Sequence, residues 1–319
     1  MSAVLVFVEH DRGVIEESSL QAIGFAREVT SSSVAAVVIG AAGTEVAARV
    51  AAAGVDAVCS IDASALADYA PEAWGDACAQ YAKSVDAIAI VGCGTDRGNE
   101  VLAHIAAVLD TPFISNITQY EASVPVKLTR LRWGGSLLEH ATLDVGLAVL
   151  SCAPHAFDSP QSGVGEVPRS EFVAALRDDA ARTRIVERVS LASGITLQTA
   201  PVVVSGGRGV GSADGFAHLE ALAELLGGAV GCSRVVTNQG WRPHSDQVGQ
   251  TGKRVAPELY IACGISGAIQ HWIGMQAAQR VLAINLDKDA PMVTKADFAV
   301  IGDLHEIVPA IVEELRRRR

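Results

Sequence analysis

The chain has 319 residues, more than one hydrophobic core usually supports, so two domains are expected. Half of the residues are hydrophobic and only 19% are charged, a composition typical of buried parallel strands covered by helices. The formal net charge of -11 argues against a nucleic-acid binder, because binding to phosphates requires a cationic surface.

The first half of the chain alternates apolar runs of strand length with helical patterns. The predicted strands are residues 3–8, 34–39, 55–60 and 85–91. The predicted helices are residues 18–29 and 44–53, with others between the last two strands and after Arg97. This alternation predicts a mostly parallel sheet with helices on both faces.

Three strand-like runs then follow without helices between them, at residues 124–132, 136–143 and 147–152. Gly134 and Gly135 join the first two, so we expect this stretch to be antiparallel and to extend the same sheet. Residues 153–169 contain three prolines and little periodicity, which indicates a surface connection. We place the N-terminal α/β domain at residues 1–190.

A second series of strands and helices begins after an expected linker at residues 191–200. The predicted strands are residues 202–204, 229–232, 259–263, 281–286 and 298–301, and the predicted helices are residues 216–226, 266–279 and 304–316. We expect this C-terminal domain, residues 201–319, to be a three-layer α/β sandwich.

The cysteines, the N-terminus and the apolar runs bear on where the protein resides. The six cysteines include no C-x-x-C pair, so neither a zinc site nor a disulfide framework is indicated. The chain begins with an apolar strand and lacks the features of a secretory signal. No apolar run approaches the roughly twenty residues that cross a bilayer. We therefore expect a cytoplasmic protein that is not embedded in a membrane.

A glycine-rich turn at residues 205–211 follows the first strand of the C-terminal domain. Gly207 and Gly209 can bring backbone amides against a pyrophosphate, and Arg208 supplies positive charge. The G-x-G-x-x-G fingerprint of dinucleotide binding is incomplete, because Ser212 replaces its third glycine and no acidic residue ends the next strand. From this turn alone, phosphate binding and a packing role remain equally open.

Polar or glycine residues also follow the other strands of this domain. They are Ser233 and Arg234 after the second strand, Gly264, Ile265, Ser266 and Gly267 after the third, Asn285 at the end of the fourth, and Asp303 and Leu304 after the fifth. A polar loop at residues 247–253 and the helical pair Gln270 and His271 add further donors. Singly, each feature has a structural alternative, such as a solvated arginine or a packing histidine. Because the carboxyl ends of parallel strands share one edge, a single extended ligand with phosphates and a polar heterocycle explains them together.

The same segments closely resemble the alpha subunit of electron-transfer flavoproteins. The resemblance rests on VVSGGRG at 203–209, GCSR at 231–234, QVGQTGK at 247–253, PELY at 257–260, GISGAIQH at 264–271 and AIN at 283–285. It continues through residues 297–304 and covers nearly all of residues 201–319. It implies an FAD-binding C-terminal domain and an N-terminal domain of a nucleotide-hydrolase-like fold.

The resemblance also implies roles for single residues. Arg208 would lie by the FAD pyrophosphate, Ser266 and Asn285 would help hold the phosphate and ribitol region, and Asp303 would contact the adenosine end. The full set expected at the cofactor is Gly207, Arg208, Gly209, Ser233, Arg234, Gln247, Gly249, Gln250, Thr251, Gly264, Ile265, Ser266, Gly267, Gln270, His271, Asn285, Asp303 and Leu304.

At the flavin ring itself, the resemblance places Arg234 over the isoalloxazine and Thr251 in hydrogen-bonding distance of its N5. Gln270 and His271 would sit near the edge formed by N1 and the C2 carbonyl. Ser233 and Gln250 would complete the pocket.

Partners follow from the same resemblance. The N-terminal domain would dock onto a homologous beta subunit that binds AMP, forming a heterodimer. The complex would accept electrons from acyl-CoA dehydrogenases and related dehydrogenases of fatty acid beta-oxidation, and pass them singly to a quinone oxidoreductase or another acceptor. Asn99, Glu100 and Ala153 stand where family members often carry arginines, which leaves room for a paralogue that serves a dedicated dehydrogenase.

Two other functions remain open at this point. A nicotinamide-dependent oxidoreductase is supported by the glycine-rich turn but opposed by the incomplete fingerprint. An adenine-nucleotide-binding sensor would use the two α/β domains without electron transfer. No nucleophile, base and orienting group occur at a recognisable spacing, so we expect an electron carrier without substrate chemistry of its own.

Overall fold

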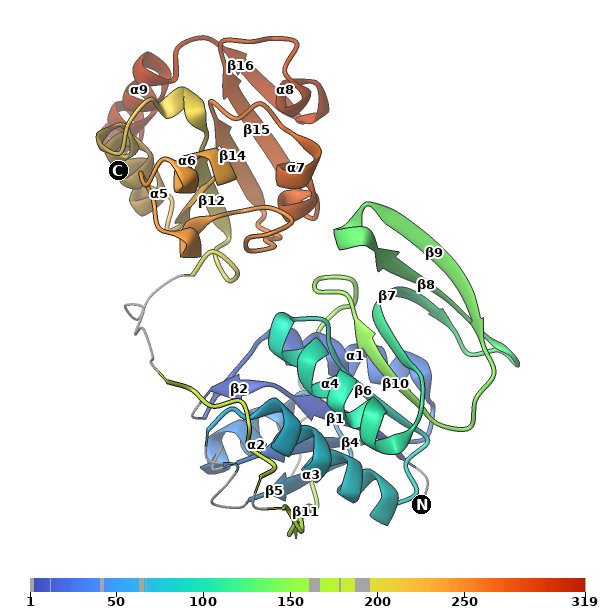
Figure 1. Ribbon diagram of the computed structural model, residues 1–319. Helices are drawn as coiled ribbons and strands as arrows, with labels where there is room; N and C mark the ends of the chain where they lie inside the picture. Colours follow the sequence, from blue (N-terminus) through green and yellow to red (C-terminus); the bar gives the residue numbers. More distant parts are fainter. Residues whose placement is uncertain are drawn as a thin grey trace. The chain divides into compact units, whose positions relative to one another are not determined.

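The computed structural model describes residues 3–11, 13–40, 43–62, 66, 68–160, 167–177, 179–186 and 196–318. The chain divides into two compact units, Met1–Val189 and Ser190–Arg319 (Figure 1). Residues 191–195 of the expected linker lie outside the described residues. Within the described ranges, no helix has the length and apolar character needed to cross a membrane.

The N-terminal unit is built on a nine-stranded sheet with the order β11-β5-β4-β1-β6-β10-β7-β8-β9. The strands are β1 (Ala3–Val8), β4 (Ser33–Ile39), β5 (Ala57–Ile61), β6 (Ala89–Cys93), β7 (Phe113–Glu121), β8 (Val126–Arg132), β9 (Leu137–Leu143), β10 (Ala148–Cys152) and β11 (Arg169–Phe172). The pairings from β11 to β7 are parallel, and β7, β8 and β9 pair antiparallel. A small separate hairpin pairs β2 (His10–Asp11) with β3 (Val14–Ile15).

Helices cover both faces of this sheet (Figure 1). They are α1 (Ser18–Val29), α2 (Gly43–Ala52), α3 (Pro71–Ser84) and α4 (Asp96–Leu109). Because side chains alternate along a strand, Val4 and Val6 of β1 pack with α1 and α2, whereas Leu5 and Phe7 pack with α3 and α4. All six residues of β1 are buried, as expected for a central strand between two helical layers.

The antiparallel prediction for residues 124–152 is right for β8 and β9 and wrong for β10. β10 enters the sheet between β6 and β7 and runs parallel to both. All five of its residues are buried, the pattern of a parallel strand covered on both faces, whereas exposed residues alternate along β9. Two strands of the nine-stranded sheet, β7 and β11, are absent from the sequence prediction because both are rich in polar residues.

The C-terminal unit has a five-stranded parallel sheet with the order β13-β12-β14-β15-β16. Its strands are β12 (Val202–Gly206), β13 (Ala229–Cys232), β14 (Leu259–Cys263), β15 (Arg280–Asn285) and β16 (Phe298–Ile301). Its helices are α5 (Ala217–Leu225), α6 (Arg234–Asn238), α7 (Ile269–Met275), α8 (Pro291–Lys295) and α9 (Leu304–Arg318). Apolar residues of α5 and α9 pack on one face of the sheet, and Met275 of α7 and Met292 of α8 pack on the other. The expected three-layer sandwich is confirmed.

Helix α7 is shorter than the predicted 266–279. It begins at Ile269 because Gly264 and Gly267 have φ values of +62° and +83°, which an α-helix does not allow. Gly267 also approaches the backbone of Met292 so closely that an added Cβ would lie 2.3 Å from its nitrogen. Residues 264–267 therefore form a tight turn at the end of β14.

Candidate functional site

The carboxyl ends of all five strands of the C-terminal sheet lie along one edge, because every pairing in it is parallel. β12 lies between β13, the next strand along the chain, and β14. The strand order therefore reverses between β12 and β14, and ligands of open α/β sheets bind at such a switch point. The turns that follow β12 and β14 are the two glycine-rich segments.

These two turns touch through their backbones. The amide of Gly207 donates to the Cys263 carbonyl over 2.9 Å, and the amide of Gly209 donates to the Gly264 carbonyl over 3.1 Å. A Cβ added to Gly207 would lie 2.3 Å from the Gly264 oxygen. Both glycine amides are therefore occupied within the protein, and the close backbone contact, which leaves no room for side chains, fixes the two turns at the switch point.

Two arginines follow the strands at this edge and have no partners among the described residues. Arg208 begins the short helical turn after Gly207, and Arg234 begins α6 after Ser233. Both side chains are exposed, and neither has a hydrogen bond or an ion pair with another described residue. Arg242, by contrast, pairs with Glu220 and Asp246. Arg208 and Arg234 are therefore available to an anionic ligand.

The loop of residues 247–253 lies between the end of β13 and α7. The Val248 amide donates to the Cys232 carbonyl over 2.9 Å, and the Gln250 amide donates to the Gln270 carbonyl over 2.7 Å. Gly249 has a φ of +147°. A Cβ added to Gly274 of α7 would lie 2.2 Å from the Gly249 nitrogen, so the two backbones are in close contact. This contact holds the loop against α7 and leaves Gln250 and Thr251 exposed.

Gln270 and His271 lie side by side in the first turn of α7 but differ in exposure. The Gln270 side chain is exposed, whereas His271 is 7% exposed. The Nε2 atom of His271 is 2.9 Å from the Tyr260 hydroxyl, and its Nδ1 atom is buried without a hydrogen-bond partner. Burial lowers the pKa of His271 to about 4, against the opposing effect of the Val248 backbone, so the ring is neutral at pH 7.

The remaining expected residues reach the same edge, and several have structural duties there. Asn285 donates from Nδ2 to the Ile265 carbonyl over 3.0 Å, and the Ser266 carbonyl accepts from the Met292 amide. Asp303 accepts from the His305 amide over 2.8 Å at the start of α9. Besides His271, the side chains of Gln247, Ile265 and Leu304 are buried, at 1%, 3% and 6% exposure.

The donor set on this edge suits FAD. Two unpaired arginines, exposed Gln250 and Thr251, and the orphaned Nδ1 of His271 lie along it. Within the described ranges, no group of His, Cys, Asp or Glu side chains could hold a metal ion, and the six cysteines are free and buried. Sequence reasoning missed Thr237 and Tyr260, which contact Gln247 and His271. Thr237 lies in an unpredicted helix, and Tyr260 reads as a core residue of a strand.

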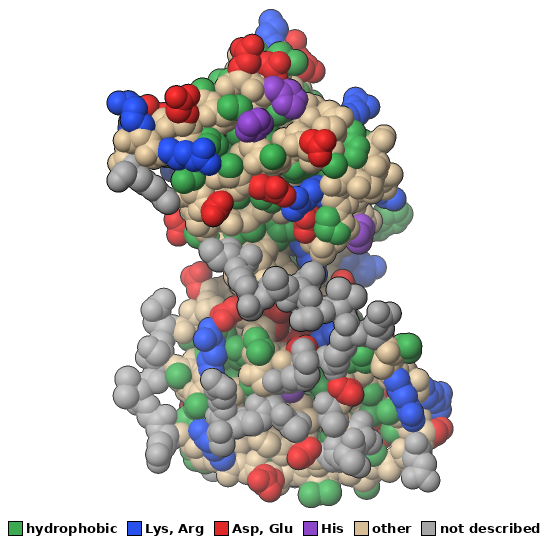
Figure 2. Space-filling model, turned by 90° about the vertical axis from the view of Figure 1, so that its left-hand side faces the viewer, with side chains coloured by type: hydrophobic (Ala, Val, Ile, Leu, Met, Phe, Trp, Pro, Cys, Tyr) green, Lys and Arg blue, Asp and Glu red, His purple; other side chains and the backbone are tan. Residues whose placement is uncertain are grey.

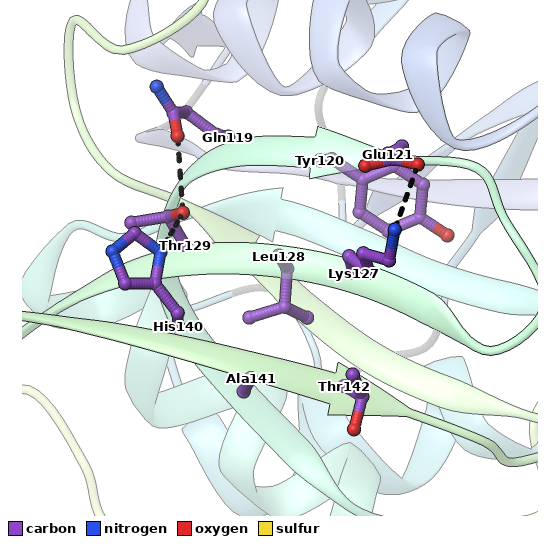
Figure 3. Close-up of a pocket in the computed structure, with 9 residues that line it drawn as sticks. All are labelled: Gln119, Tyr120, Glu121, Lys127, Leu128, Thr129, His140, Ala141 and Thr142. Atoms are coloured by element: carbon purple, nitrogen blue, oxygen red, sulfur yellow. Dashed lines mark hydrogen bonds and ion pairs between the residues drawn. The ribbon is translucent and has the colours of Figure 1, made fainter.

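A concavity of about 450 Å³ lies on the antiparallel part of the N-terminal sheet (Figure 3). One row of side chains across it is Gln119, Thr129 and His140, in which the Thr129 hydroxyl is 3.1 Å from Gln119 and 3.0 Å from His140. In a second row, Lys127 pairs with Glu121 over 3.4 Å. These polar groups bond to one another, unlike the free arginines of the C-terminal edge.

The face drawn in Figure 2 shows no large patch of a single charge among the described residues. Acidic and basic side chains of the described residues are interspersed there over both units.

Comparisons with known proteins match both units. Residues 4–192 match the family model of the electron transfer flavoprotein domain, and residues 196–276 match that of the electron transfer flavoprotein FAD-binding domain. The chain is 35% identical to the electron transfer flavoprotein subunit alpha of Mycobacterium leprae over all of both chains. It is 34% identical to the subunit of the same name in Pseudomonas aeruginosa, over 97% of this chain and 98% of that protein. A probable mitochondrial subunit alpha of Caenorhabditis elegans is 34% identical over 99% of this chain and 94% of that protein.

Proposed function

This chain belongs to the family of electron transfer flavoprotein alpha subunits, and on that premise we propose that it carries FAD on its C-terminal unit and passes electrons singly between redox enzymes. The observation that supports this most is the backbone contact between the turns at Gly207–Gly209 and Gly264, with Arg208 and Arg234 unpaired beside it. Bound FAD supplies the one-electron chemistry; the chain binds and orients it.

The phosphate end of the cofactor is assigned to the switch point. Arg208 would neutralise the pyrophosphate, as guanidinium groups do elsewhere, whereas the amides of Gly207 and Gly209 already donate to Cys263 and Gly264. Ser266 and Asn285 would hold the neighbouring phosphate and ribitol, and Asp303 would contact the adenosine. Asn285 and Asp303 each also bond to the backbone, which fixes the side chains before the ligand arrives.

The flavin ring is assigned to the surface between Arg234, the loop at 247–253 and the start of α7. Arg234 would lie over the ring, and the Thr251 hydroxyl would donate to it near N5. Gln270 and His271 would face its N1 and C2 carbonyl edge, where donors favour added negative charge. The neutral His271 ring, whose pKa is lowered to about 4, would act there as a hydrogen-bonding group of fixed charge.

A beta subunit that binds AMP is the partner proposed for the N-terminal unit. β9 pairs only with β8, so its outer edge is open among the described residues. Trp133, Leu137 and Leu138 at and beside the hairpin tip are 78%, 55% and 63% exposed. An open strand edge with exposed apolar side chains suits a protein partner.

The wider assignment is that of a cytoplasmic carrier in fatty acid beta-oxidation. Acyl-CoA and related dehydrogenases would donate electrons, and a quinone oxidoreductase or another acceptor would receive them. The family membership supports this assignment. The buried free thiols are compatible with a reducing compartment.

The test is to co-express the full-length chain with its beta subunit and to release the cofactor by denaturation. A yellow complex that releases FAD, and whose colour bleaches on mixing with a reduced acyl-CoA dehydrogenase, supports the proposal. A colourless protein that binds NAD would support a nicotinamide-dependent oxidoreductase. FAD release without bleaching by any dehydrogenase would contradict the assigned donors and leave the cofactor assignment intact.

A further inference from the structure

The Gln247 side chain is buried and fully engaged. It is 1% exposed, and a buried carboxamide normally requires partners for both its oxygen and its nitrogen. Its Oε1 atom accepts from the Thr237 hydroxyl over 2.9 Å. Its Nε2 atom donates to the Thr251 hydroxyl oxygen over 3.0 Å. Gln247 thus joins α6 to the loop that presents Thr251.

Gln247 is anchored through its own backbone. A hydroxyl has one hydrogen, so the donation from Thr237 to Gln247 excludes a simultaneous bond to the Arg234 carbonyl, which is also 2.9 Å away. The backbone of Gln247 forms a bridge to Cys232, and its carbonyl accepts from the Lys253 amide over 2.6 Å. The position of the Gln247 carboxamide is therefore fixed by its backbone and by its two side-chain hydrogen bonds.

The direction of these bonds decides what Thr251 can offer. A hydroxyl has one hydrogen and two acceptor lone pairs. Because the Thr251 oxygen accepts from Gln247, its hydrogen remains for an acceptor on the exposed side of the loop. Gln247 itself, with both ends of its carboxamide occupied, has no polar group left for a ligand.

We propose that Gln247 is a positioning residue that holds the Thr251 hydroxyl as a hydrogen-bond donor toward bound FAD. This inference rests on the proposed function, since it assumes that the flavin ring lies over Thr251. A donor fixed at the ring favours the arrival of an electron there, so Gln247 raises the reduction potential of a cofactor that it does not touch.

The test is Gln247→Met in the full-length chain, reconstituted with FAD and its beta subunit. Methionine keeps the length of the side chain and removes the amide. We expect the first one-electron reduction equilibrium to fall about fivefold, the worth of one neutral hydrogen bond, which corresponds to a potential lower by about 40 mV. Gln279→Met, at an exposed position, is the matched control and should leave the potential unchanged.

A double-mutant cycle with Thr251→Val separates positioning from a general structural effect. If Gln247 acts through Thr251, the shift caused by Gln247→Met disappears in the Thr251→Val background. A shift of undiminished size in that background, or an unchanged potential in Gln247→Met alone, would overturn the inference.

Thr237→Val provides a second route if Gln247→Met does not fold. It removes the hydroxyl that donates to the carboxamide oxygen. We expect the equilibrium constant of the first one-electron reduction to fall about twofold, which is a fraction of the effect of one hydrogen bond. An unchanged potential would count against the inference. Failure of the unmodified chain to bind FAD would instead refute the proposed function, so the two failures are distinguishable.

Discussion

At the scale of single residues, the C-terminal edge is distinguished by arginines that have no acid beside them. Several other arginines of the described chain are engaged: Arg27 with Asp56, Arg130 with Glu139, and Arg242 with two acids. An acidic chain that keeps Arg208 and Arg234 free on one edge is equipped for an anion. Hydrogen bonds from guanidinium to phosphate are among the strong ones in proteins.

Replacing Arg234 tests this reading. Arg234→Ala should weaken FAD binding by about tenfold or more, because a hydrogen bond to a charged group contributes about 1.5–3 kcal/mol. The fold should be unaffected, since the side chain is exposed and has no described partner. Flavin titration by fluorescence measures the FAD affinity, and thermal unfolding of the apo chain measures the stability of the fold. Arg280→Ala, at an exposed ion pair with Asp297, is the control. An unchanged FAD affinity and an unchanged potential would count against the site.

The buried His271 predicts a pH dependence of stability. Its folded pKa is lowered from 6.5 to about 4, so the unfolded chain binds the proton first, and stability is lost as the pH falls from above 6.5 toward 4. As the pH falls from 7 to 5, protonation of His271 in the unfolded chain should lower the unfolding free energy by about 2 kcal/mol. In His271→Phe the unfolding free energy should fall by about 2 kcal/mol less over the same interval, as measured by urea unfolding. Equal losses in both proteins would show that His271 is not buried as a neutral ring.

At the scale of elements, the site depends on turns that only glycine can form. Gly264 and Gly227 both have a φ of +62°, but their surroundings differ. A Cβ at Gly264 would lie 2.8 Å from the Gly209 Cα, whereas a Cβ at Gly227 would meet nothing within 4 Å. The pair separates backbone strain from the closeness of the two turns.

Gly227→Ala should therefore cost only the strain of a left-handed residue, about 1–2 kcal/mol of unfolding free energy. Gly264→Ala should cost more, because the turns after β12 and β14 must also separate, and it should lower FAD affinity by about tenfold while Gly227→Ala leaves that affinity unchanged. Denaturant unfolding and flavin titration measure the two quantities. Equal losses in both variants would mean that the contact between the turns does not matter.

The elements of the C-terminal unit could be read from the sequence because each strand is apolar and is followed by glycine or polar residues. Strands β13, β14 and β16 begin and end at the predicted residues. Helices α6 and α8, with five residues each, are too short for a helical pattern to show. In the N-terminal unit, β7 has a mixed sequence with a bulge and an αL residue at Asn116, so no alternating pattern marks it.

The site itself was predictable only as far as its edge. The sequence places polar residues after parallel strands, and parallel strands must end together. Which way a side chain turns depends on packing: Gln247 and His271 point inward to Thr237 and Tyr260, while Gln250 and Gln270 beside them are exposed. These inward contacts join residues ten and eleven positions apart on different elements, and no local pattern predicts them.

At the scale of the whole molecule, the two units divide the work of an alpha subunit: one carries the ligand edge, and the other extends an antiparallel hairpin. Asn99 and Glu100 form internal contacts in the N-terminal unit. Asn99 accepts from the Ser151 hydroxyl over 2.7 Å, and Glu100 accepts from the Tyr69 hydroxyl over 2.6 Å. Both side chains thus have local structural roles.

The hairpin prediction concerns assembly. Leu138→Lys should weaken association with the beta subunit by about tenfold, as loss of an apolar interface contact does, and should change the unfolding free energy by less than about 0.5 kcal/mol, because Leu138 is 63% exposed. Val14→Lys, at a 74% exposed position on β3, is the control. Association is measured by titration calorimetry with purified beta subunit. Normal affinity in Leu138→Lys would place the docking surface elsewhere.

The central claim is that the edge formed by the ends of β12 to β16 holds FAD. It is tested most directly by denaturing the purified complex and identifying the released cofactor, for the unmodified chain and for a variant with both Arg208→Ala and Arg234→Ala. The account predicts stoichiometric FAD from the first and little from the second, with both proteins folded. FAD retained in full by the double variant, or a colourless unmodified complex, would contradict it.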